Sequence, residues 1–260
     1  MQEIFNPEVF NTVLSVMALS AVVVFLCLLK VEAGYGVAYT KKWGPAVNNK
    51  LGWILMEAPV FFAMLWLWLS SDRRGDTVLV VMALLFLFHY FQRSFVFPFL
   101  IKGKSVMPLS VILMGVTFNT LNAYMIGGWL FYVSPVDYYG GVSWLMSPMF
   151  IVGCVIFFVG MAINWHSDYI IRHLRKPGDT GHYIPRGGMF RYVTSANYFG
   201  EFLEWCGFAL LTFSAAGAVF ALWTFANLAP RARKLHQRYE CEFGDEYKKL
   251  NRKYILPYIY

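Results

Sequence analysis

The chain has 260 residues, of which 58% are hydrophobic and only 14% are charged. A soluble domain usually carries about 25% charged residues, because a domain of this size still needs a polar exterior. The composition therefore excludes a disordered or fibrous protein, argues against a conventional soluble enzyme, and indicates a protein of the lipid bilayer. The net charge of +7 does not indicate nucleic acid binding, because the basic residues lie between apolar runs and not on a separate domain.

Seven apolar stretches predict an all-α, polytopic integral membrane protein with seven transmembrane helices. They are residues 11–29, 51–71, 77–101, 108–133, 145–166, 196–214 and 216–230. The first stretch follows no basic segment and precedes no small-residue cleavage site, so it reads as a retained helix and not as a signal peptide. The last two stretches meet within residues 214–217, which indicates a tight helical hairpin.

The distribution of basic residues predicts the orientation of these helices. With the N-terminus outside, all but three of the 22 lysines and arginines fall in cytoplasmic segments; Arg73 and Arg74 lie outside and Arg93 lies within a span. Six spans would place the basic C-terminal tail on the wrong side. We therefore predict a single membrane domain, residues 1–260, with the N-terminus out and the C-terminus in the cytoplasm.

Cysteine usage indicates neither a metal site nor a disulfide framework. Cys27, Cys154, Cys206 and Cys241 lie far apart and form no CxxC pair. We read them as small apolar core residues, and we predict no metal.

Ionisable groups inside two of the spans are candidate functional residues, since such groups are costly in a bilayer. Glu57 lies inside the second stretch, two positions before Pro59, and the third stretch contains His89, Tyr90 and Arg93 on one broad helix face. Two readings remain open and can coexist. One is a buried ion pair between Glu57 and Arg93, and the other is a proton-donating pair of Glu57 and Tyr90 facing a ligand oxygen.

The fifth span leads into a polar stripe. Asn164, Asp168, Arg172 and Arg175 have the spacing of one helix face, on a helix that residues 177–178, Pro-Gly, are expected to end. Mixed donors and acceptors suit a nucleotide better than a lipid headgroup, whereas a solvated juxtamembrane face is the alternative reading.

Further polar groups follow in the sixth span and in the tail. Asn197, Glu201 and Glu204 lie on one face of an otherwise apolar helix, where the carboxylates need cationic or donor partners. The preceding arginines are the expected source, and His236 and Tyr239 lie three apart in the basic tail. No GxGxxG, GxxxxGK[ST], HExxH or GxSxG motif is present, so any dinucleotide would bind without a Rossmann fold.

The C-terminal hundred residues closely resemble the C-terminal domain of the steroid 5α-reductase family. The most specific strings are HSDxIxxxLRKPG, from residue 166, and IPxGGxFxYVxxANxxGE, from residue 184; residues 243–257 also resemble the end of that domain. Residues 53–59 resemble the family's second-helix segment with its catalytic glutamate, and residues 89–93 resemble the segment with its tyrosine. Related enoyl-CoA and polyprenol reductases share parts of the pattern.

This resemblance implies an enzyme that uses NADPH to reduce the Δ4 double bond of a 3-oxo-Δ4 steroid to the 5α product. It implies that Glu57 and Tyr90 are catalytic and bind the C3 carbonyl. The implied substrate-binding residues are Trp53, Met56 and Arg93. The implied NADPH-binding residues, within a cofactor region 164–260, are Asn164, Asp168, Arg172, Arg175, Tyr183, Asn197, Glu201, His236 and Tyr239.

The sequence departs from the family pattern at several positions. Met56 stands where some members have glutamine, Lys102 and Lys104 stand where others have arginine, and His182-Tyr183 replaces a Tyr-Arg pair.

The predicted topology implies that NADPH enters from the cytoplasm and that the steroid enters from the bilayer lipid. Hydride delivery to C5 would produce an enolate, whose C3 oxygen needs hydrogen-bond donors. We expect that the protein binds no nucleic acid and needs no obligate protein partner. We expect it in the bacterial inner membrane or in the endoplasmic reticulum membrane, depending on the source. A membrane methyltransferase using S-adenosylmethionine and a transporter are the alternatives from other functional classes.

Overall fold

The computed structural model describes residues 3–31, 39–103, 105–176, 179 and 181–260. These residues are mainly helical, as predicted, and they form two compact units. Unit 1 is drawn from Met1–Met17 and Ala33–Phe150, and unit 2 from Ala18–Glu32 and Ile151–Tyr260. Helix α1 (Pro7–Lys30) contributes to both. The single-domain reading stays a prediction.

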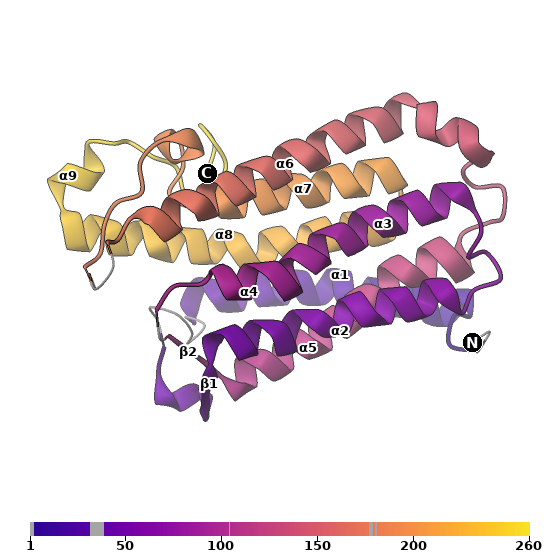
Figure 1. The fold of residues 1–260 in the computed structure, drawn as a ribbon, viewed down its shortest axis with the longest axis horizontal. Helices are drawn as coiled ribbons and strands as arrows, with labels where there is room; N and C mark the ends of the chain where they lie inside the picture. The colour runs from indigo at the N-terminus through magenta and orange to yellow at the C-terminus, as the bar shows by residue number, and fades with distance from the viewer. Residues whose placement is uncertain (1–2, 32–38, 104, 177–178, 180) are drawn as a thin grey trace. The chain divides into compact units, whose positions relative to one another are not determined.

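Unit 1 is built on two parallel helices that begin at a strand pair. Strand β1 (Ala46–Asn48) pairs antiparallel with β2 (Val106–Pro108), so that Val47 lies opposite Met107. Helix α2 (Asn49–Leu69) follows β1 and α5 (Leu109–Gly128) follows β2, and the strands lie at one end of this helix pair (Figure 1). The strand pair thereby sets the register in which α2 and α5 pack.

Capping explains where α2 and α3 begin. The Asn48 side chain accepts hydrogen bonds from the backbone N–H groups of Lys50 and Leu51 at the start of α2. The Asp76 side chain does the same for the first turn of α3 (Thr77–Phe91). Such side-chain acceptors satisfy N–H groups that have no partner within the helix.

The third span changes its helical geometry before it ends. Gln92–Val96 forms a π-helical turn, followed by the short helix α4 (Phe97–Leu100). Pro98 has no N–H to donate to the Ser94 carbonyl, so the regular ladder cannot continue there. The π turn begins two residues after Tyr90, and π turns are frequent at functional sites.

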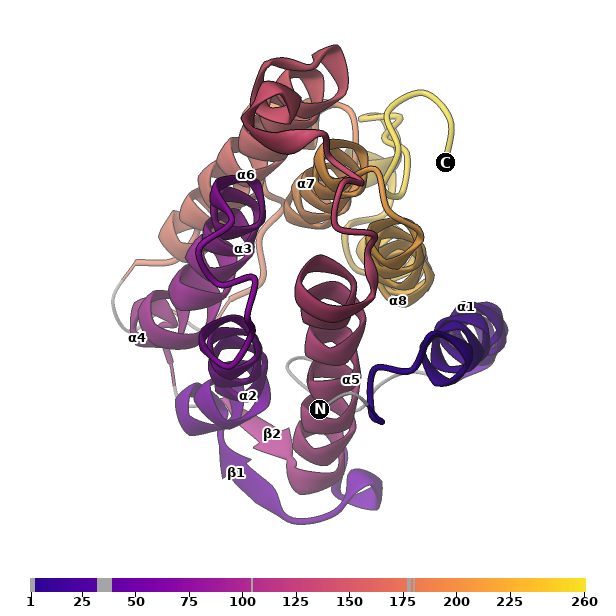
Figure 2. The same ribbon diagram turned by 90° about the vertical axis from the view of Figure 1, so that its right-hand side faces the viewer.

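Unit 2 contains most of α6 (Pro148–His173), with α7 (Ala196–Thr212), α8 (Ala215–Phe243) and α9 (Asp245–Lys248). Helix α7 lies between α6 and α8 (Figure 1, Figure 2). Phe213 ends α7 in a left-handed conformation and the Ser214 side chain caps α8, which forms the expected hairpin. The C-terminal segment returns to residues 192–195 through a parallel bridge between Val193 and Lys253.

Five helical segments in the described part of the chain are long and apolar enough to cross a membrane. They are Pro7–Lys30, Asn49–Leu69, Thr77–Leu100, Leu109–Val133 and Pro148–His173, and they agree with the first five predicted spans to within a few residues, apart from the C-terminal extension of α6 to His173. Helix α7 has only 17 residues, and α8 joins an apolar half to a basic half. The count of seven spans and the orientation therefore stay predictions.

Candidate active site

Glu57 lies in a part of α2 where the backbone ladder is interrupted. Pro59 cannot donate a hydrogen bond to the Leu55 carbonyl. The next carbonyl, that of Met56, accepts a hydrogen bond from Asn119 Nδ2 on α5 at 2.8 Å. The same amide nitrogen donates to Glu57 Oε2 at 3.2 Å. Asn119 is buried, so Glu57 has a defined hydrogen-bond partner within the apolar helices.

Tyr90 lies in the last turn of α3 and is only 3% exposed. Its hydroxyl oxygen accepts a hydrogen bond from Asn122 Nδ2 on α5 at 3.0 Å, and Asn122 is fully buried. The His89 ring packs edge-on against the Tyr90 ring, with 5.0 Å between ring centroids. The two residues predicted to be catalytic therefore each receive an amide N–H from α5.

Two of the three predicted substrate-binding residues lie together. The Arg93 guanidinium carbon is 4.5 Å from the Trp53 ring centroid and 4.4 Å from the Phe97 ring centroid, which is cation–π geometry. Met56 lies against Gly115 on α5, where a Cβ atom would clash with the Met56 side chain. The ion pair between Glu57 and Arg93 stays a prediction. Lys104 lies outside the described residues.

Three predicted cofactor residues meet between α6 and α7. Asn164 Nδ2 donates to the Asn197 carbonyl at 2.9 Å, and Asn197 Nδ2 donates to Asp168 Oδ1 at 3.2 Å. Asn164 and Asp168 are buried. Gly200 allows this approach, because a Cβ there would clash with the Asn164 backbone nitrogen.

The rest of the predicted stripe is more accessible. Helix α6 carries Asn164, Asp168 and Arg172 as expected and ends at His173; residues 177–178 lie outside the described residues. Arg172 is half-buried and Arg175 is exposed beyond the helix end. Glu201 is half-buried, one turn after Asn197 on α7. The pairing of Glu201 and Glu204 with the arginines stays a prediction.

His236 and Tyr239 lie in the basic half of α8 and contact the C-terminal segment. His236 Nδ1 is 2.6 Å from Thr194 Oγ1 and 3.2 Å from Tyr247 Oη. The Tyr239 ring packs against the Tyr247 ring, with 5.3 Å between centroids. Burial lowers the pKa of His236 and raises the pKa of Tyr239 to about 12, so both side chains are uncharged near neutral pH.

Arg252 is a buried cation that the sequence reasoning missed. It is 7% exposed, and its Nη2 donates to the Pro185 carbonyl at 2.8 Å. Its Nε and Nη1 atoms are buried and have no hydrogen-bond partner among the described residues. The N–H groups on two nitrogen atoms of one guanidinium match the oxygens of a phosphate. In the sequence Arg252 is one of many basic residues in the tail, and no local pattern distinguishes it.

Tyr183 is exposed and bonds within its own loop. Its hydroxyl donates to Asp179 Oδ2 at 2.7 Å, which lowers the pKa of Asp179 and raises the pKa of Tyr183. His182 Nδ1 lies 2.8 Å from Glu242, and Arg186 donates to Glu246 at 2.7 Å. These contacts attach the loop to α8 and α9, so His182 has a partner within the protein at a position that departs from the family pattern.

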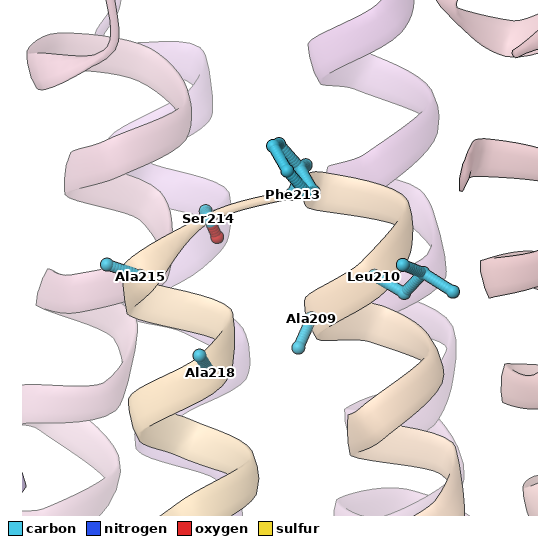
Figure 3. Close-up of a pocket in the computed structure, with 6 residues that line it drawn as sticks. All are labelled: Ala209, Leu210, Phe213, Ser214, Ala215 and Ala218. Atoms are coloured by element: carbon cyan, nitrogen blue, oxygen red, sulfur yellow. The ribbon is translucent and has the colours of Figure 1, made fainter.

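A separate pocket lies at the turn between α7 and α8 and has a volume of about 390 Å³. Figure 3 shows its lining residues: Ala209, Leu210, Phe213, Ser214, Ala215 and Ala218. No titratable side chain lines it, so it offers nothing for acid, base or nucleotide chemistry.

Comparison with known proteins places the chain in a family. A family profile described as 3-oxo-5-alpha-steroid 4-dehydrogenase matches residues 105–260. The chain is 43% identical to 3-oxo-5-alpha-steroid 4-dehydrogenase 1 of Mus musculus, with 92% of each chain covered. It is 41% identical to the Homo sapiens protein of that name, with 82% of this chain and 81% of that protein covered. It is 36% identical to Steroid 5-alpha-reductase DET2 of Arabidopsis thaliana over the full length of both. The chain therefore belongs to the 3-oxo-5-alpha-steroid 4-dehydrogenase, or steroid 5α-reductase, family of membrane oxidoreductases.

Proposed function

We propose that this protein reduces the Δ4 double bond of 3-oxo-Δ4 steroids to 5α-steroids with NADPH. The relatives' names support steroid 5α-reduction. The observation that carries the proposal is that Glu57 and Tyr90 occur in apolar helices and are each hydrogen-bonded to a buried amide. An ionisable side chain inside a membrane span is costly and by default indicates a functional site.

Both side chains have the chemistry to act at the carbonyl oxygen of an enone. Reduction at C5 moves negative charge onto the C3 oxygen, and hydrogen-bond donors at that oxygen stabilise the enolate. The Tyr90 hydroxyl is one donor. Glu57 would be the second donor or would orient the Tyr90 hydroxyl. Trp53, Met56 and Arg93 would border the steroid, which would enter from the bilayer.

The side chains of unit 2 fit NADPH, an anionic nucleotide that would enter from the cytoplasm. Arg252 offers two buried nitrogen atoms, Nε and Nη1, that have no hydrogen-bond partner among the described residues. The Arg172 and Arg175 guanidinium groups are more accessible, and arginine N–H groups bind phosphate oxygens. Asn164, Asp168, Arg172, Arg175, Tyr183, Asn197, Glu201, His236 and Tyr239 would hold the cofactor together with Arg252. When bound, NADPH supplies the hydride.

Membranes that contain the protein provide the direct test. Testosterone or progesterone with NADPH should give the 5α product, identified by mass spectrometry. Turnover of an acyl-CoA or a polyprenal instead would assign the protein to a related reductase. Thermal stabilisation by S-adenosylmethionine and not by NADPH would favour a methyltransferase.

Substitution of the two catalytic residues separates chemistry from cofactor binding. Glu57→Gln and Tyr90→Phe should each lower kcat by about 10²–10³-fold, the usual effect of losing one such donor. Thermal stabilisation by NADPH should be unchanged in both. Thr117→Ala, at an exposed position of α5 whose hydroxyl donates only to the Leu113 carbonyl, is the control. Equal loss of NADPH binding in both variants would contradict these roles.

A further inference from the structure

Residues 256–260 form a tight turn that presents two large apolar side chains, and we name it the Tyr258 turn. The Tyr260 carbonyl accepts hydrogen bonds from the Ile255 and Leu256 N–H groups at 2.9 and 2.8 Å, and the Tyr260 N–H donates to the Leu256 carbonyl at 3.1 Å. At the tip, Tyr258 is 78% exposed and Ile259 is 77% exposed. Backbone hydrogen bonds therefore hold both sides of the tip, and the two side chains project from a fixed turn.

The backbone of Tyr258 is strained. Its φ angle is +65°, in the left-handed region that residues with a Cβ atom rarely adopt. Its ring packs against the ring of Tyr192, with 5.5 Å between centroids, and Tyr192 is itself 40% exposed. In water, a glycine at position 258 would relieve the strain and expose less apolar surface. An aromatic residue is unfavourable there on both counts, which indicates that the tip lies in a medium other than water.

The packing of the turn fixes its level along the apolar helices. The Tyr260 ring centroid is 6.4 Å from that of Phe225 on α8, which is 6.3 Å from that of Phe25 on α1. Phe25 stands five residues before Lys30 and Phe225 six residues before Arg231, the first charged residue after each apolar stretch.

These spacings place the turn near the surface of a bilayer. At about 1.5 Å per helical residue, its contacts with α1 and α8 lie roughly 7–9 Å inside the charged ends of the two helices. Interfacial side chains enter a bilayer to about 5–10 Å, at the boundary between headgroups and acyl chains. Helix α1 (Pro7–Lys30) is one of the helices long and apolar enough to span the membrane, so lipid surrounds it at this level.

Cations lie beside the tip. Arg191 directly precedes Tyr192, and the Lys253 backbone N–H donates to the Tyr192 carbonyl at 2.9 Å. The Arg191 and Lys253 side chains are both exposed. Tyrosine rings are enriched where membrane proteins meet the headgroups, and lysine and arginine are attracted to anionic lipids there.

We propose that Tyr258 and Ile259 insert into the phospholipid bilayer around the apolar helices, at the boundary between headgroups and acyl chains. The partner of this surface is lipid, and not a second copy of the chain or another protein. The proposal does not depend on the steroid activity.

Insertion ties the start of α7 to the membrane surface. The Lys253 carbonyl accepts a hydrogen bond from the Thr194 N–H at 2.8 Å, and the Tyr254 carbonyl accepts one from the Ser195 N–H at 3.2 Å. Ser195 directly precedes α7. A turn held in lipid therefore restrains the strand of chain that leads into this helix.

Depth measurements with a nitroxide label test the insertion. In a variant without native cysteines, Ile259→Cys carries the label, and the protein is reconstituted in vesicles of phosphatidylcholine and phosphatidylglycerol. Relaxation by oxygen, which partitions into the bilayer, should exceed relaxation by a water-soluble nickel chelate. The control is the same label on Cys241 in a variant that retains only this cysteine, because Cys241 is exposed in the basic half of α8. There the nickel chelate should dominate.

Two results would overturn the proposal. One is greater accessibility to nickel than to oxygen at position 259, as at Cys241, which would place the tip in water. The other is low accessibility to both reagents, which would indicate that protein, such as a second copy of the chain, covers the tip.

Hydrogen exchange of an unlabelled variant gives an independent readout. Because the Ile259 side chain is 77% exposed, Ile259→Ser removes little contact within the protein and mainly removes contact with lipid. In vesicles, exchange at the Ile255 and Leu256 amides should become about 10-fold faster, since the apolar transfer that holds the turn closed is lost. Ile259→Leu should exchange like the parent, and so should Lys249→Ser at another exposed position. Exchange that is unchanged in Ile259→Ser would contradict the insertion.

Discussion

Thr194 is the residue around which the C-terminal segment is organised. Its Oγ1 atom is 2.6 Å from both His236 Nδ1 and Tyr247 Oη, and it donates to the Lys253 carbonyl at 3.1 Å. Burial is the main reason why the pKa of His236 is lowered; Glu240 opposes the shift and Arg252 adds to it. A neutral imidazole is therefore part of the folded tail.

Acidification should loosen this segment. Because the folded pKa of His236 lies below the ordinary value of 6.5, the unfolded segment takes up the proton first. The stabilising contribution is complete above pH 6.5 and is lost as the pH falls below it. Hydrogen-exchange protection factors at the Thr194 and Lys253 amides, which donate to the Lys253 and Tyr192 carbonyls, should fall as the pH is lowered from about 6.5.

His236→Gln is the matched variant, since glutamine is polar and does not titrate in this range. Its protection factors should be independent of pH over the same interval. The same decline in His236→Gln as in the parent would show that another group is responsible.

At the scale of elements, α6 and α7 approach each other backbone to backbone. Gly153 and Gly160 on α6 and Gly200 and Gly207 on α7 are each seven residues apart, so each pair lies on one helix face. A Cβ atom at any of the four would meet the backbone of the opposite helix. Because lipid provides no hydrophobic driving force between helices, such close packing is a main source of their association.

Gly207→Ala should therefore destabilise the protein. Alanine improves helix propensity by about 1 kcal/mol. Against this, the new methyl group clashes with the Phe157 backbone nitrogen, and overpacking against groups that cannot move costs about 1–3 kcal/mol. The clash should outweigh the propensity and lower the melting temperature measured in detergent. Gly75→Ala, where the added atom meets nothing within 4 Å, is the control. A higher melting temperature for Gly207→Ala would contradict the close packing.

At the scale of the whole molecule, the distribution of basic residues predicts which ends of the helices face the cytoplasm. The segment between α2 and α3 contains Arg73 and Arg74, whereas the tail beyond the last predicted span contains eight lysines and arginines. Such an asymmetry orients membrane proteins with the basic side inward.

Thiol labelling tests this orientation. Cys27 and Cys241 are exposed, so the prediction that the cysteines are core residues is wrong for these two. In a variant that retains only Cys241, on α8, a membrane-impermeant maleimide should react only after permeabilisation of cells. In a variant without native cysteines, Gly75→Cys should react in intact cells. Reaction of Cys241 in intact cells would reverse the predicted topology. Five or seven spans both fit this outcome if the termini lie on opposite sides.

The positions of the first five apolar helices were predictable to within a few residues, because the hydropathy of a span is a sum over neighbouring residues in the sequence. The third and fourth predicted spans, 77–101 and 108–133, correspond to Thr77–Leu100 and Leu109–Val133. The π turns within them were not predictable from hydropathy, since apolar content does not depend on helix pitch. Likewise, α8 extends to Phe243, well past the apolar stretch, because its contacts with α9 and the C-terminal segment stabilise its polar half.

Candidate site residues were predictable where a charge or an acidic hydroxyl stands in an apolar span, as with Glu57 and Tyr90. Asn119 and Asn122 were missed because a neutral amide barely changes the hydropathy of a helix. Arg252 was missed for the opposite reason, since it lies among many basic residues and only the return of the tail to residues 192–195 buries it.

The sequence by itself determined that this is a membrane protein, where its apolar helices lie, and to which family it belongs. It also determined the predicted orientation. Each of these depends on composition or on local sequence motifs. Only the tertiary structure decided which polar groups pair. Asn119 and Glu57 are 62 residues apart, and Asn122 and Tyr90 are 32 apart. Hydrogen bonds of this range depend on the register between helices, which the β1–β2 pair and close side-chain packing set, and no local pattern contains that register.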